Sequence, residues 1–170
     1  MKVHGPIVIL GFMACGKTEV SRLVAKELNL SLIDLDEEIT SIVGRSPAAL
    51  IRAEGEQAFR QVETATLNTV LTRASTAVIA LGGGAWIEKT NRELLAAHKA
   101  TSVWLDTPFE ICWRRIEAST DDRPLGPTKA QARELYQRRL PIYRLATIRI
   151  EVDNADAPRQ IAARILANLP

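Results

Sequence analysis

Cysteine and long apolar runs are scarce in this sequence, and neither sign of charge dominates it. Two cysteines, Cys15 and Cys112, among 170 residues do not make a disulfide framework. No apolar run approaches the roughly 18 residues that would span a bilayer. The 22 Lys and Arg residues nearly balance the 20 Asp and Glu residues, giving a net charge of +2. That balance argues against a protein that mainly coats nucleic acid or an anionic membrane.

What is present suits a folded protein of one domain. The hydrophobic fraction is 46% and the charged fraction 25%, and 170 residues are enough for one sizeable core. Lys2 and the apolar residues 6–15 faintly resemble a signal sequence. A single basic residue is little for such a signal, and a buried strand followed by a turn explains the segment better. We therefore predict one domain over residues 1–170 and a cytoplasmic location.

Short apolar runs alternate with longer stretches of helical periodicity. This alternation predicts an α/β fold of three layers, in which helices cover both faces of a five-stranded parallel sheet. The expected strands are residues 7–10, 32–35, 77–81, 102–105 and 148–152. The expected helices are residues 18–28, 37–43, 56–73, 90–98, 108–118, 129–141 (where proline breaks or kinks the last) and 158–169. Residues 118–128 are polar and predict a mobile loop.

Polar clusters follow the first three predicted strands. Residues 11–18 follow the first, Asp34 and Asp36 end the second, and residues 82–84 follow the third. Ligands of open parallel sheets bind beyond the carboxyl ends of the strands. We therefore expect a ligand site at this edge.

The segment GFMACGKT at residues 11–18 fits the pattern G-x-x-x-x-G-K-[ST] between a predicted strand and a predicted helix. Glycines let the backbone N–H groups face phosphate oxygens, and the helix N-terminus adds partial positive charge. Lys17 would reach the terminal phosphates, and the Thr18 hydroxyl would coordinate Mg²⁺. A glycine turn with a chance lysine is the alternative. The placement favours a nucleoside triphosphate but does not identify the acceptor.

Asp34 and Asp36 lie two residues apart, so both can face one crevice. One carboxylate could hold Mg²⁺ through water while the other accepts hydrogen bonds from a substrate hydroxyl. Asp36 would equally suit the N-cap of the following helix, and spacing leaves both interpretations open. Gly82, Gly83 and Gly84 are more glycines than a tight turn needs, which indicates close approach of the backbone to a ligand.

Arginines are concentrated near this predicted site. Arg60 on its own would be a surface residue or an ion-pair partner of Glu63. Guanidinium groups fit phosphates and carboxylates, so their density favours an anionic transition state and an anionic acceptor, although solvated helix faces would also account for it. The other arginines are Arg114, Arg115, Arg123, Arg138 and Arg139.

The order and spacing of seven motifs resemble the shikimate kinase family over nearly the whole chain. The motifs are GFMACGKT (11–18), IDLDEEI (33–39), GRS (44–46), GEQAFRQVE (55–63), LGGGA (81–85), RPLG (123–126) and RRLPIY (138–143). The resemblance implies a P-loop kinase fold like that of nucleoside monophosphate kinases. It implies a core (1–35, 77–110, 145–170), a substrate-binding region (36–62) and a mobile lid (118–128).

The resemblance implies transfer of the γ-phosphate of ATP to the 3-hydroxyl of shikimate, in the route to chorismate and the aromatic amino acids. The products would be shikimate 3-phosphate and ADP. ATP and Mg²⁺ are thus the expected co-substrate and cofactor. Shikimate and ATP are the expected partners, without nucleic acid or membrane, and a monomer is expected.

The family's roles fall on matching positions of this sequence. Lys17, Asp36 and Arg123 would carry catalysis, with Asp36 as the base and Arg123 closing over the transferring phosphate. Thr18 would bind Mg²⁺, and Asp34 would steady it through water. The implied ATP site is Met13, Ala14, Cys15, Gly16, Lys17, Thr18, Arg115, Arg123 and Pro158. The implied shikimate site is Asp36, Arg60, Gly82, Gly83, Gly84 and Arg139, with both arginines on the carboxylate.

Three positions depart from the family pattern. Many members have glycine where Ala14 stands, so a β-carbon must find room in the phosphate loop. Members often have phenylalanine where Ile51 stands, which removes one aromatic wall from the acceptor pocket. Members often have an arginine beside the adenine, whereas residues 153–158 contain none.

Two alternatives remain at this stage. A P-loop kinase for another small acceptor, such as gluconate or a nucleoside monophosphate, would have no reason to keep Asp36, Arg60 and Arg139 together. A nucleotide-binding regulatory module would be expected to lose catalytic groups or to carry a further domain.

Overall fold

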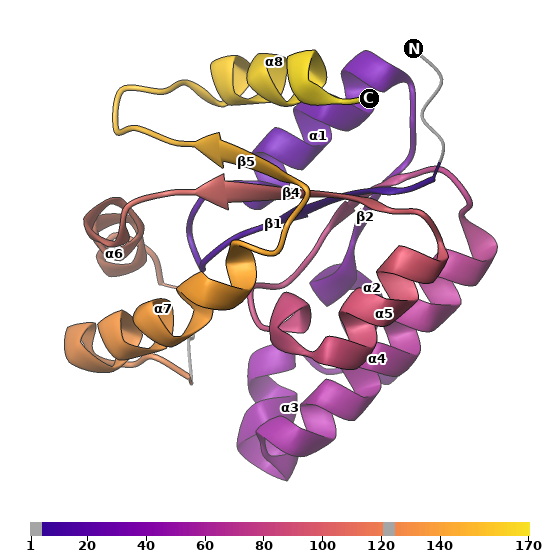
Figure 1. Cartoon of the computed structure of the whole chain (residues 1–170). Helices are drawn as coiled ribbons and strands as arrows, with labels where there is room; N and C mark the ends of the chain where they lie inside the picture. Colours follow the sequence, from indigo (N-terminus) through magenta and orange to yellow (C-terminus); the bar gives the residue numbers. More distant parts are fainter. Residues whose placement is uncertain (1–4, 121–124) are drawn as a thin grey trace.

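A single parallel sheet organises the computed structural model, which describes residues 5–120 and 125–170 (Figure 1). The sheet has five strands in the order β2-β3-β1-β4-β5, and every neighbouring pair is parallel. The predicted α/β class is therefore confirmed. The strands are β1 (Ile7–Leu10), β2 (Leu32–Asp34), β3 (Val78–Ala80), β4 (Thr101–Asp106) and β5 (Ile148–Glu151).

The central strand β1 is fully buried on both faces. Each of its four side chains has no exposed surface, and Ile7 pairs with Val78 on one side and Thr101 on the other. Parallel strands that are covered on both faces need continuous apolar sequence in place of alternation. The run IVIL satisfies that need, so this strand could be predicted from sequence.

Helices cover both faces of the sheet (Figure 1). Helices α1 (Lys17–Leu28) and α8 (Pro158–Asn168) lie above it, and α4 (Glu56–Arg73), α5 (Lys89–Ala97) and α7 (Lys129–Tyr143) lie below it. The remaining helical segments are α2 (Leu35–Val43), α3 (Pro47–Glu54), α6 (Phe109–Glu117) and the 3-10 turn η1 (Ala85–Ile87).

Helix α3 and the turn η1 were not predicted. The local signals for α3 are Ser46, whose Oγ accepts a hydrogen bond from the N–H of Ala49 at 3.2 Å, and Pro47 in the first turn. A serine cap followed by proline is a recognised helix start. Only Leu50 of α3 is buried, so the apolar periodicity that identified the other helices is nearly absent.

Two predicted helix boundaries were wrong by two residues, and several other boundaries differ by one. Helix α2 begins at Leu35, two residues early, because Asp34 caps it. Helix α7 continues past Pro141 to Tyr143. Packing holds this last turn, because Tyr143 is fully buried against Trp104 and the indole N–H of Trp86 donates to the carbonyl of Ile142 at 2.8 Å.

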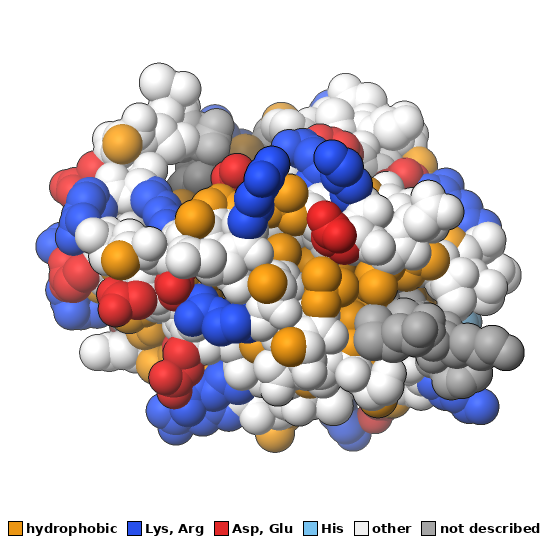
Figure 2. Space-filling model, turned by 90° about the horizontal axis from the view of Figure 1, so that it is seen from above, with side chains coloured by type: hydrophobic (Ala, Val, Ile, Leu, Met, Phe, Trp, Pro, Cys, Tyr) orange, Lys and Arg blue, Asp and Glu red, His pale blue; other side chains and the backbone are white. Residues whose placement is uncertain are grey.

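Charged side chains of both signs lie on the face of the molecule that Figure 2 shows. Figure 2 shows basic and acidic side chains interspersed across the face seen from above, around a group of hydrophobic ones. Within residues 5–120 and 125–170, no helix is both long enough and apolar enough to cross a membrane. Cys15 and Cys112 are both buried free thiols.

Candidate active site

The segments that follow all five strands contribute residues to one cleft of about 780 Å³. The loop of residues 11–18 lies after β1, Asp36 after β2, and Gly82 to Gly84 after β3. Arg115 on α6 comes after β4, and Pro158 of α8 comes after β5. A cavity therefore lies at the edge of the sheet where the sequence predicts a ligand site. Helices α3 and α4 form its far wall through Ile51 and Arg60.

The loop of residues 11–18 has an unusual backbone conformation. Gly16 precedes α1 with φ 98°, in the left-handed region that glycine tolerates. The Nζ of Lys17 donates to the carbonyls of Gly11 at 3.1 Å and Phe12 at 2.9 Å. The ammonium group therefore lies folded over its own loop, at the end of the cleft where α1 begins.

Ala14 is one of three non-glycine residues with positive φ in the described part of the chain, at 58°. An L-residue in this region costs about 1–2 kcal/mol, and glycine does not bear that cost. The carbonyl of Ala14 accepts a hydrogen bond from Nη1 of Arg115 at 3.2 Å, which ties α6 to the loop. The strain explains why glycine suits this position, and the Arg115 contact helps to hold the alanine there.

Asp34, and not Asp36, caps helix α2. Its Oδ1 accepts hydrogen bonds from the backbone N–H groups of Asp36 at 3.0 Å and Glu37 at 3.4 Å. Its Oδ2 accepts from the hydroxyl of Thr18 at 3.2 Å. The capping interpretation that spacing left open for Asp36 therefore belongs to its neighbour.

The Thr18–Asp34 pair offers oxygen atoms of the kind that Mg²⁺ prefers. Thr18 lines the cleft, whereas Asp34 lies behind it and is absent from the lining. Among residues 5–120 and 125–170, no group of three or more His, Cys, Asp or Glu side chains could enclose a metal ion. This donor set fits a Mg²⁺ ion that takes most of its ligands from phosphates and water, as Mg²⁺ at nucleotide sites does.

Asp36 lies in the first turn of α2, and its carboxylate opens into the cleft. Asp36 is exposed at the cleft, but the protein around its carboxylate reduces its hydration, and this is the main cause that raises its pKa above the ordinary value. The carboxylate of Asp34 raises the pKa further, while Lys17 and Arg60 lower it. A carboxylate with a raised pKa binds a proton more readily than one in water, which suits a general base.

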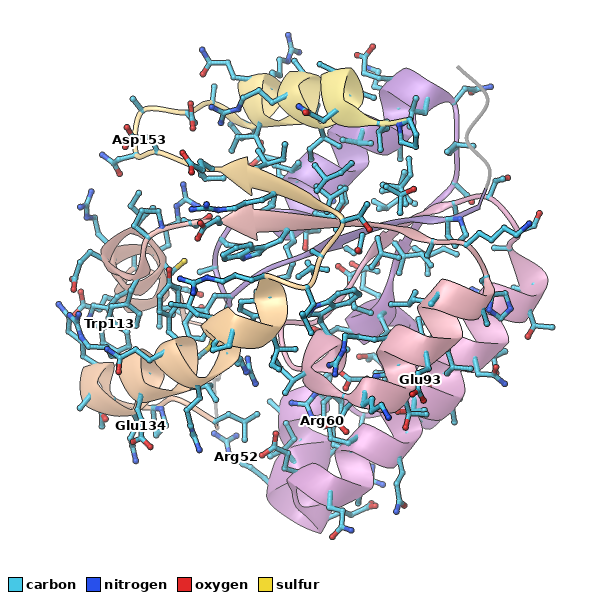
Figure 3. The ribbon with its side chains drawn as sticks, viewed as in Figure 1. Arg52, Arg60, Glu93, Trp113, Glu134 and Asp153 are labelled. Atoms are coloured by element: carbon cyan, nitrogen blue, oxygen red, sulfur yellow. The ribbon has the colours of Figure 1, made fainter. Side chains whose placement is uncertain are left out.

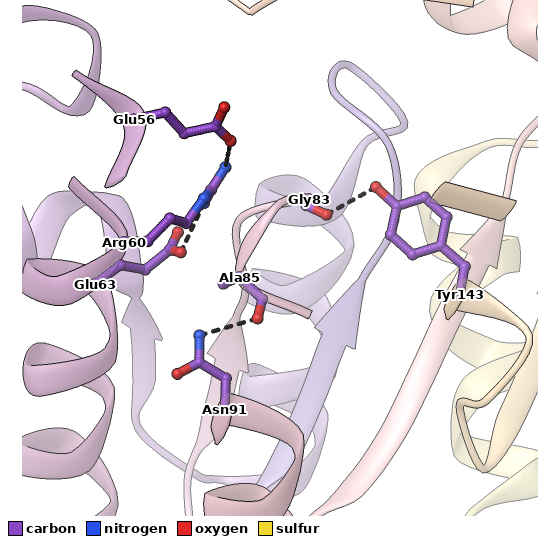
Figure 4. A network of polar contacts seen from close by, with 7 residues as sticks. All are labelled: Glu56, Arg60, Glu63, Gly83, Ala85, Asn91 and Tyr143. Atoms are coloured by element: carbon purple, nitrogen blue, oxygen red, sulfur yellow. Dashed lines mark hydrogen bonds and ion pairs between the residues drawn. The ribbon is translucent and has the colours of Figure 1, made fainter. Parts of the chain in front are cut away.

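Arg60 projects from α4 toward the segment that follows β3 (Figures 3 and 4). Its side chain is 12% exposed, with Nη1 2.6 Å from Oε2 of Glu63 and Nη2 3.1 Å from Oε1 of Glu56. Its guanidinium carbon also lies 5.0 Å from the ring centre of Phe59. Arg60 is therefore a held, largely buried cation that lines the cleft, and not a solvated surface residue.

The glycines after β3 leave space for the charged side chains of the cleft. A β-carbon on Gly82 would lie 3.3 Å from Oδ1 of Asp36, and one on Gly84 would overlap the guanidinium of Arg60. A β-carbon on Gly83 would lie 2.8 Å from the carbonyl oxygen of Gly11. None of the three has a positive φ. Glycine is needed here for space and not for backbone conformation.

Arg139 reaches the cleft from α7 and is 7% exposed. Its guanidinium lies beside the hydroxyl of Tyr143 at Gly83. That hydroxyl donates to the carbonyl of Gly83 at 2.8 Å (Figure 4). Burial raises the pKa of Tyr143 well above its usual value, so the hydroxyl remains a donor. Tyr143 thereby joins Arg139 to the glycine segment.

Most of the residues predicted for the site lie on this one cleft. They are Met13, Ala14, Cys15, Gly16, Lys17, Thr18, Asp36, Arg60, Gly82, Gly83, Gly84, Arg115, Arg139 and Pro158. Asp34 lies behind Thr18. Arg123 lies outside the described residues, as do residues 121–124 of the expected lid. The roles assigned to all of these residues remain predictions.

Sequence reasoning missed the position of Glu63, which it treated only as a partner of Arg60. The side chain is 1% exposed and lines the cleft. The signal was available, since Glu63 falls on the same helical face as Phe59, Leu67 and Val70, which are all buried. A carboxylate on the apolar face of a helix is rarely there without a partner.

Comparisons with known proteins agree over almost the whole chain. A family model described as shikimate kinase matches residues 13–170. The shikimate kinase of Streptococcus suis is 38% identical over 165 residues, 95% of this chain and 98% of that protein. That of Nostoc punctiforme is 36% identical over 167 residues, 96% of this chain and 90% of that protein. The structure of shikimate kinase from Acinetobacter baumannii in complex with shikimate has a TM-score of 0.87 and 35% identity, covering 95% of this chain and 90% of that one.

Proposed function

The chain belongs to the shikimate kinase family, and we propose that its cleft transfers the γ-phosphate of ATP to the 3-hydroxyl of shikimate. The products are shikimate 3-phosphate and ADP. The observation that supports this most directly is that Lys17, Asp36, Arg60 and Arg139 line one cleft. A triphosphate and a small hydroxy acid can therefore meet there. The reaction serves chorismate and aromatic amino acid biosynthesis.

We propose that ATP binds where α1 begins. The backbone N–H groups of Gly16, Lys17 and Thr18 start the helix, and a helix N-terminus favours phosphate. The ammonium of Lys17 would exchange the carbonyls of Gly11 and Phe12 for phosphate oxygens, which carry full charge. Met13, Ala14 and Cys15 would complete the loop around the phosphates, with Arg115 and Pro158 toward the adenine.

We propose that Thr18 holds Mg²⁺ directly and that Asp34 does so through water. When bound, the ion neutralises negative charge on the β- and γ-phosphates. The Thr18–Asp34 hydrogen bond supports this assignment, because it fixes the hydroxyl at the mouth of the phosphate loop. Asp34 is itself fixed by the two N–H groups that it caps, so the pair is rigid before any ligand binds.

We propose that the acceptor's carboxylate binds between Arg60 and Arg139, with the backbone N–H groups of Gly83 and Gly84 nearby. Two guanidinium groups select an acid over a neutral sugar and fix its orientation. Asp36 then accepts hydrogen bonds from the acceptor's hydroxyls. As the hydroxyl oxygen attacks the γ-phosphorus, Asp36 takes its proton. Its raised pKa makes it a better base than an ordinary aspartate.

The expected lid over residues 118–128 is proposed to close over this chemistry. Ser119 and Leu125, on either side of the undescribed residues, both line the cleft, which supports the proposal. Arg123 would then act on the transferring phosphate. Closure excludes water, which would otherwise compete as the acceptor. A cytoplasmic monomer that binds no nucleic acid or membrane completes the proposal.

Release of ADP in a coupled assay with Mg-ATP tests the proposal. Shikimate should support turnover, whereas gluconate and the no-acceptor control should not. Quinate tests how strictly the acceptor ring is selected. Equal turnover with gluconate, or ADP release without any acceptor, would contradict the assignment and favour another P-loop kinase. Nucleotide binding without turnover on any acceptor would favour a regulatory module.

A further inference from the structure

Glu63 is an enclosed carboxylate at the proposed acceptor site, and the proposed reaction gives it no step. Its side chain is 1% exposed, although the residue lines the cleft. Oε2 lies 2.6 Å from Nη1 of Arg60, and Oε1 lies 3.4 Å from where a β-carbon on Gly82 would stand. Of the charged groups that face it, Arg60 shares its helix, Asp36 comes from α2 and Arg139 comes from α7.

The charges around Glu63 balance before a substrate enters. Arg60 and Arg139 carry two positive charges, and Asp36 and Glu63 carry two negative charges when both are ionised. A substrate carboxylate between the arginines adds a third negative charge to this enclosed group. Charges interact more strongly in such a poorly solvated place than in water. The cluster therefore disfavours the incoming anion unless one of its own carboxylates becomes neutral.

Glu63 is better suited than its neighbours to become neutral. Burial is the main cause that raises the pKa of Glu63, to about 7, and Asp36 raises it further. Arg60 and Arg139 oppose these effects. Glu56, the other carboxylate on Arg60, is 50% exposed and keeps its hydration. Asp36 opens to the cleft and also faces Lys17. Glu63 alone of the three is closed to water.

We propose that Glu63 is a positioning residue that takes a proton from solvent when the acceptor's carboxylate binds, so that the substrate replaces Glu63 as the counter-ion of Arg60. The proton adds to the carboxylate of Glu63, and no other bond is made or broken. Neutral Glu63 still accepts the hydrogen bond from Arg60, which keeps the guanidinium in place. The inference rests on the proposed function, since it requires an anionic acceptor between Arg60 and Arg139.

Proton uptake can be measured directly by titration calorimetry of the full chain with shikimate, in buffers of different ionisation enthalpy. With a pKa of about 7 in the free protein, about half of the Glu63 carboxyls are ionised at pH 7. Binding should therefore take up about half a proton at pH 7 and more at pH 8. The dissociation constant should rise with pH by up to about tenfold per unit over this range.

Glu63→Gln should bind shikimate with no proton uptake and with an affinity that does not change between pH 6 and pH 8. The matched control Glu56→Gln removes the exposed carboxylate from the same arginine and should keep the uptake of the wild type. In kinetics, KM for shikimate should rise with pH in the wild type and stay level in Glu63→Gln. A purely structural role of Glu63 does not predict this loss of the pH dependence of KM. The pH profile of kcat should differ little between the wild type and Glu63→Gln.

Shikimate binding without proton uptake in the wild type would overturn the inference and leave the proposed function intact. Uptake that persists in Glu63→Gln would overturn it by assigning the proton to Asp36. Failure of shikimate to bind would instead overturn the proposed function, and this inference with it. If Glu63→Gln does not fold, loss of the uptake in Glu56→Gln would still overturn the inference, and Asp36→Asn separates the other two carboxylates: uptake that persists in Asp36→Asn supports Glu63, and its loss assigns the proton to Asp36.

Discussion

The guanidinium of Arg60 occupies the space that a β-carbon on Gly84 would need. Arg60 is held from the other side by Glu63 and Glu56, so it cannot move away without losing an ion pair. The absence of a side chain at residue 84 is therefore part of how the cleft positions a cation. This relationship leads to the first of five predictions.

Gly84→Ala should displace Arg60 and raise KM for shikimate by on the order of tenfold or more, with a smaller effect on KM for ATP. One weakened charge-assisted hydrogen bond is worth about 1.5–3 kcal/mol. Steady-state kinetics with each substrate varied measures the effect. Gly44→Ala is the control, because its φ of 72° makes alanine costly while no atom lies within 4 Å. It should lower stability by about 1 kcal/mol and leave KM for shikimate unchanged.

Arg60→Ala should raise KM for shikimate roughly 10- to 100-fold and KM for ATP far less, because it removes a proposed contact to the acceptor and none to the nucleotide. Arg73→Ala removes an exposed arginine at the other end of the same helix, where it pairs with Glu38 at 2.7 Å. That control should change neither constant. Equal damage to both KM values in Arg60→Ala would count against its assigned role.

Lys17→Ala should lower kcat by on the order of 100- to 1000-fold while leaving the fold intact, because it removes a cation from the transferring phosphate. Circular dichroism and thermal unfolding check the fold, and the coupled assay checks the rate. Lys26→Ala, at the exposed end of the same helix, should retain full activity. An active Lys17→Ala enzyme would refute the phosphate assignment.

Asp34 caps α2, and its proposed role in steadying Mg²⁺ can be separated from that cap. Asn caps helices as well as Asp does, so Asp34→Asn should retain stability but need more Mg²⁺ for half-maximal rate. Asp34→Ala should also lose about 1 kcal/mol of stability. Ser46→Ala removes the cap of α3 alone and should cost about the same stability with no change in the Mg²⁺ requirement. An unchanged Mg²⁺ dependence in Asp34→Asn would remove Asp34 from the metal site.

Glu63 should make the free energy of unfolding fall as pH rises. The folded protein holds the Glu63 proton up to about pH 7, whereas an unfolded glutamate releases it near its ordinary pKa of 4.5. Its contribution is therefore present below pH 4.5 and lost as pH rises through 7, and amounts to roughly 3 kcal/mol. Glu63→Gln cannot titrate, so its stability relative to the wild type should increase over this pH range. Urea unfolding at pH 5, 6, 7 and 8 measures the difference, and parallel profiles would refute the shift.

The fold could be predicted largely from sequence because its signals are local. Apolar runs such as residues 7–10 are buried on both faces, and the helix of residues 56–73 has the predicted bounds. The sequence signals for helix ends failed where a contact with a distant part of the chain determined where the helix ends. Helix α7 passes Pro141 because Tyr143 and Ile142 are held by tryptophans from other elements. Helix α3 was not predicted because only one of its residues is buried, so it lacks the apolar periodicity of the other helices.

Sequence by itself predicted the loop of residues 11–18 as the proposed phosphate site, because the pattern of glycines and a lysine lies within eight consecutive residues. It also determined the family, through the order of short motifs. Tertiary structure alone decided that Gly84 makes room for Arg60 and that Glu63 is closed to water beside two arginines. These properties depend on how closely α2, α4, α7 and the segment after β3 pack together. Chain order does not specify the distances between those helices, and packing does.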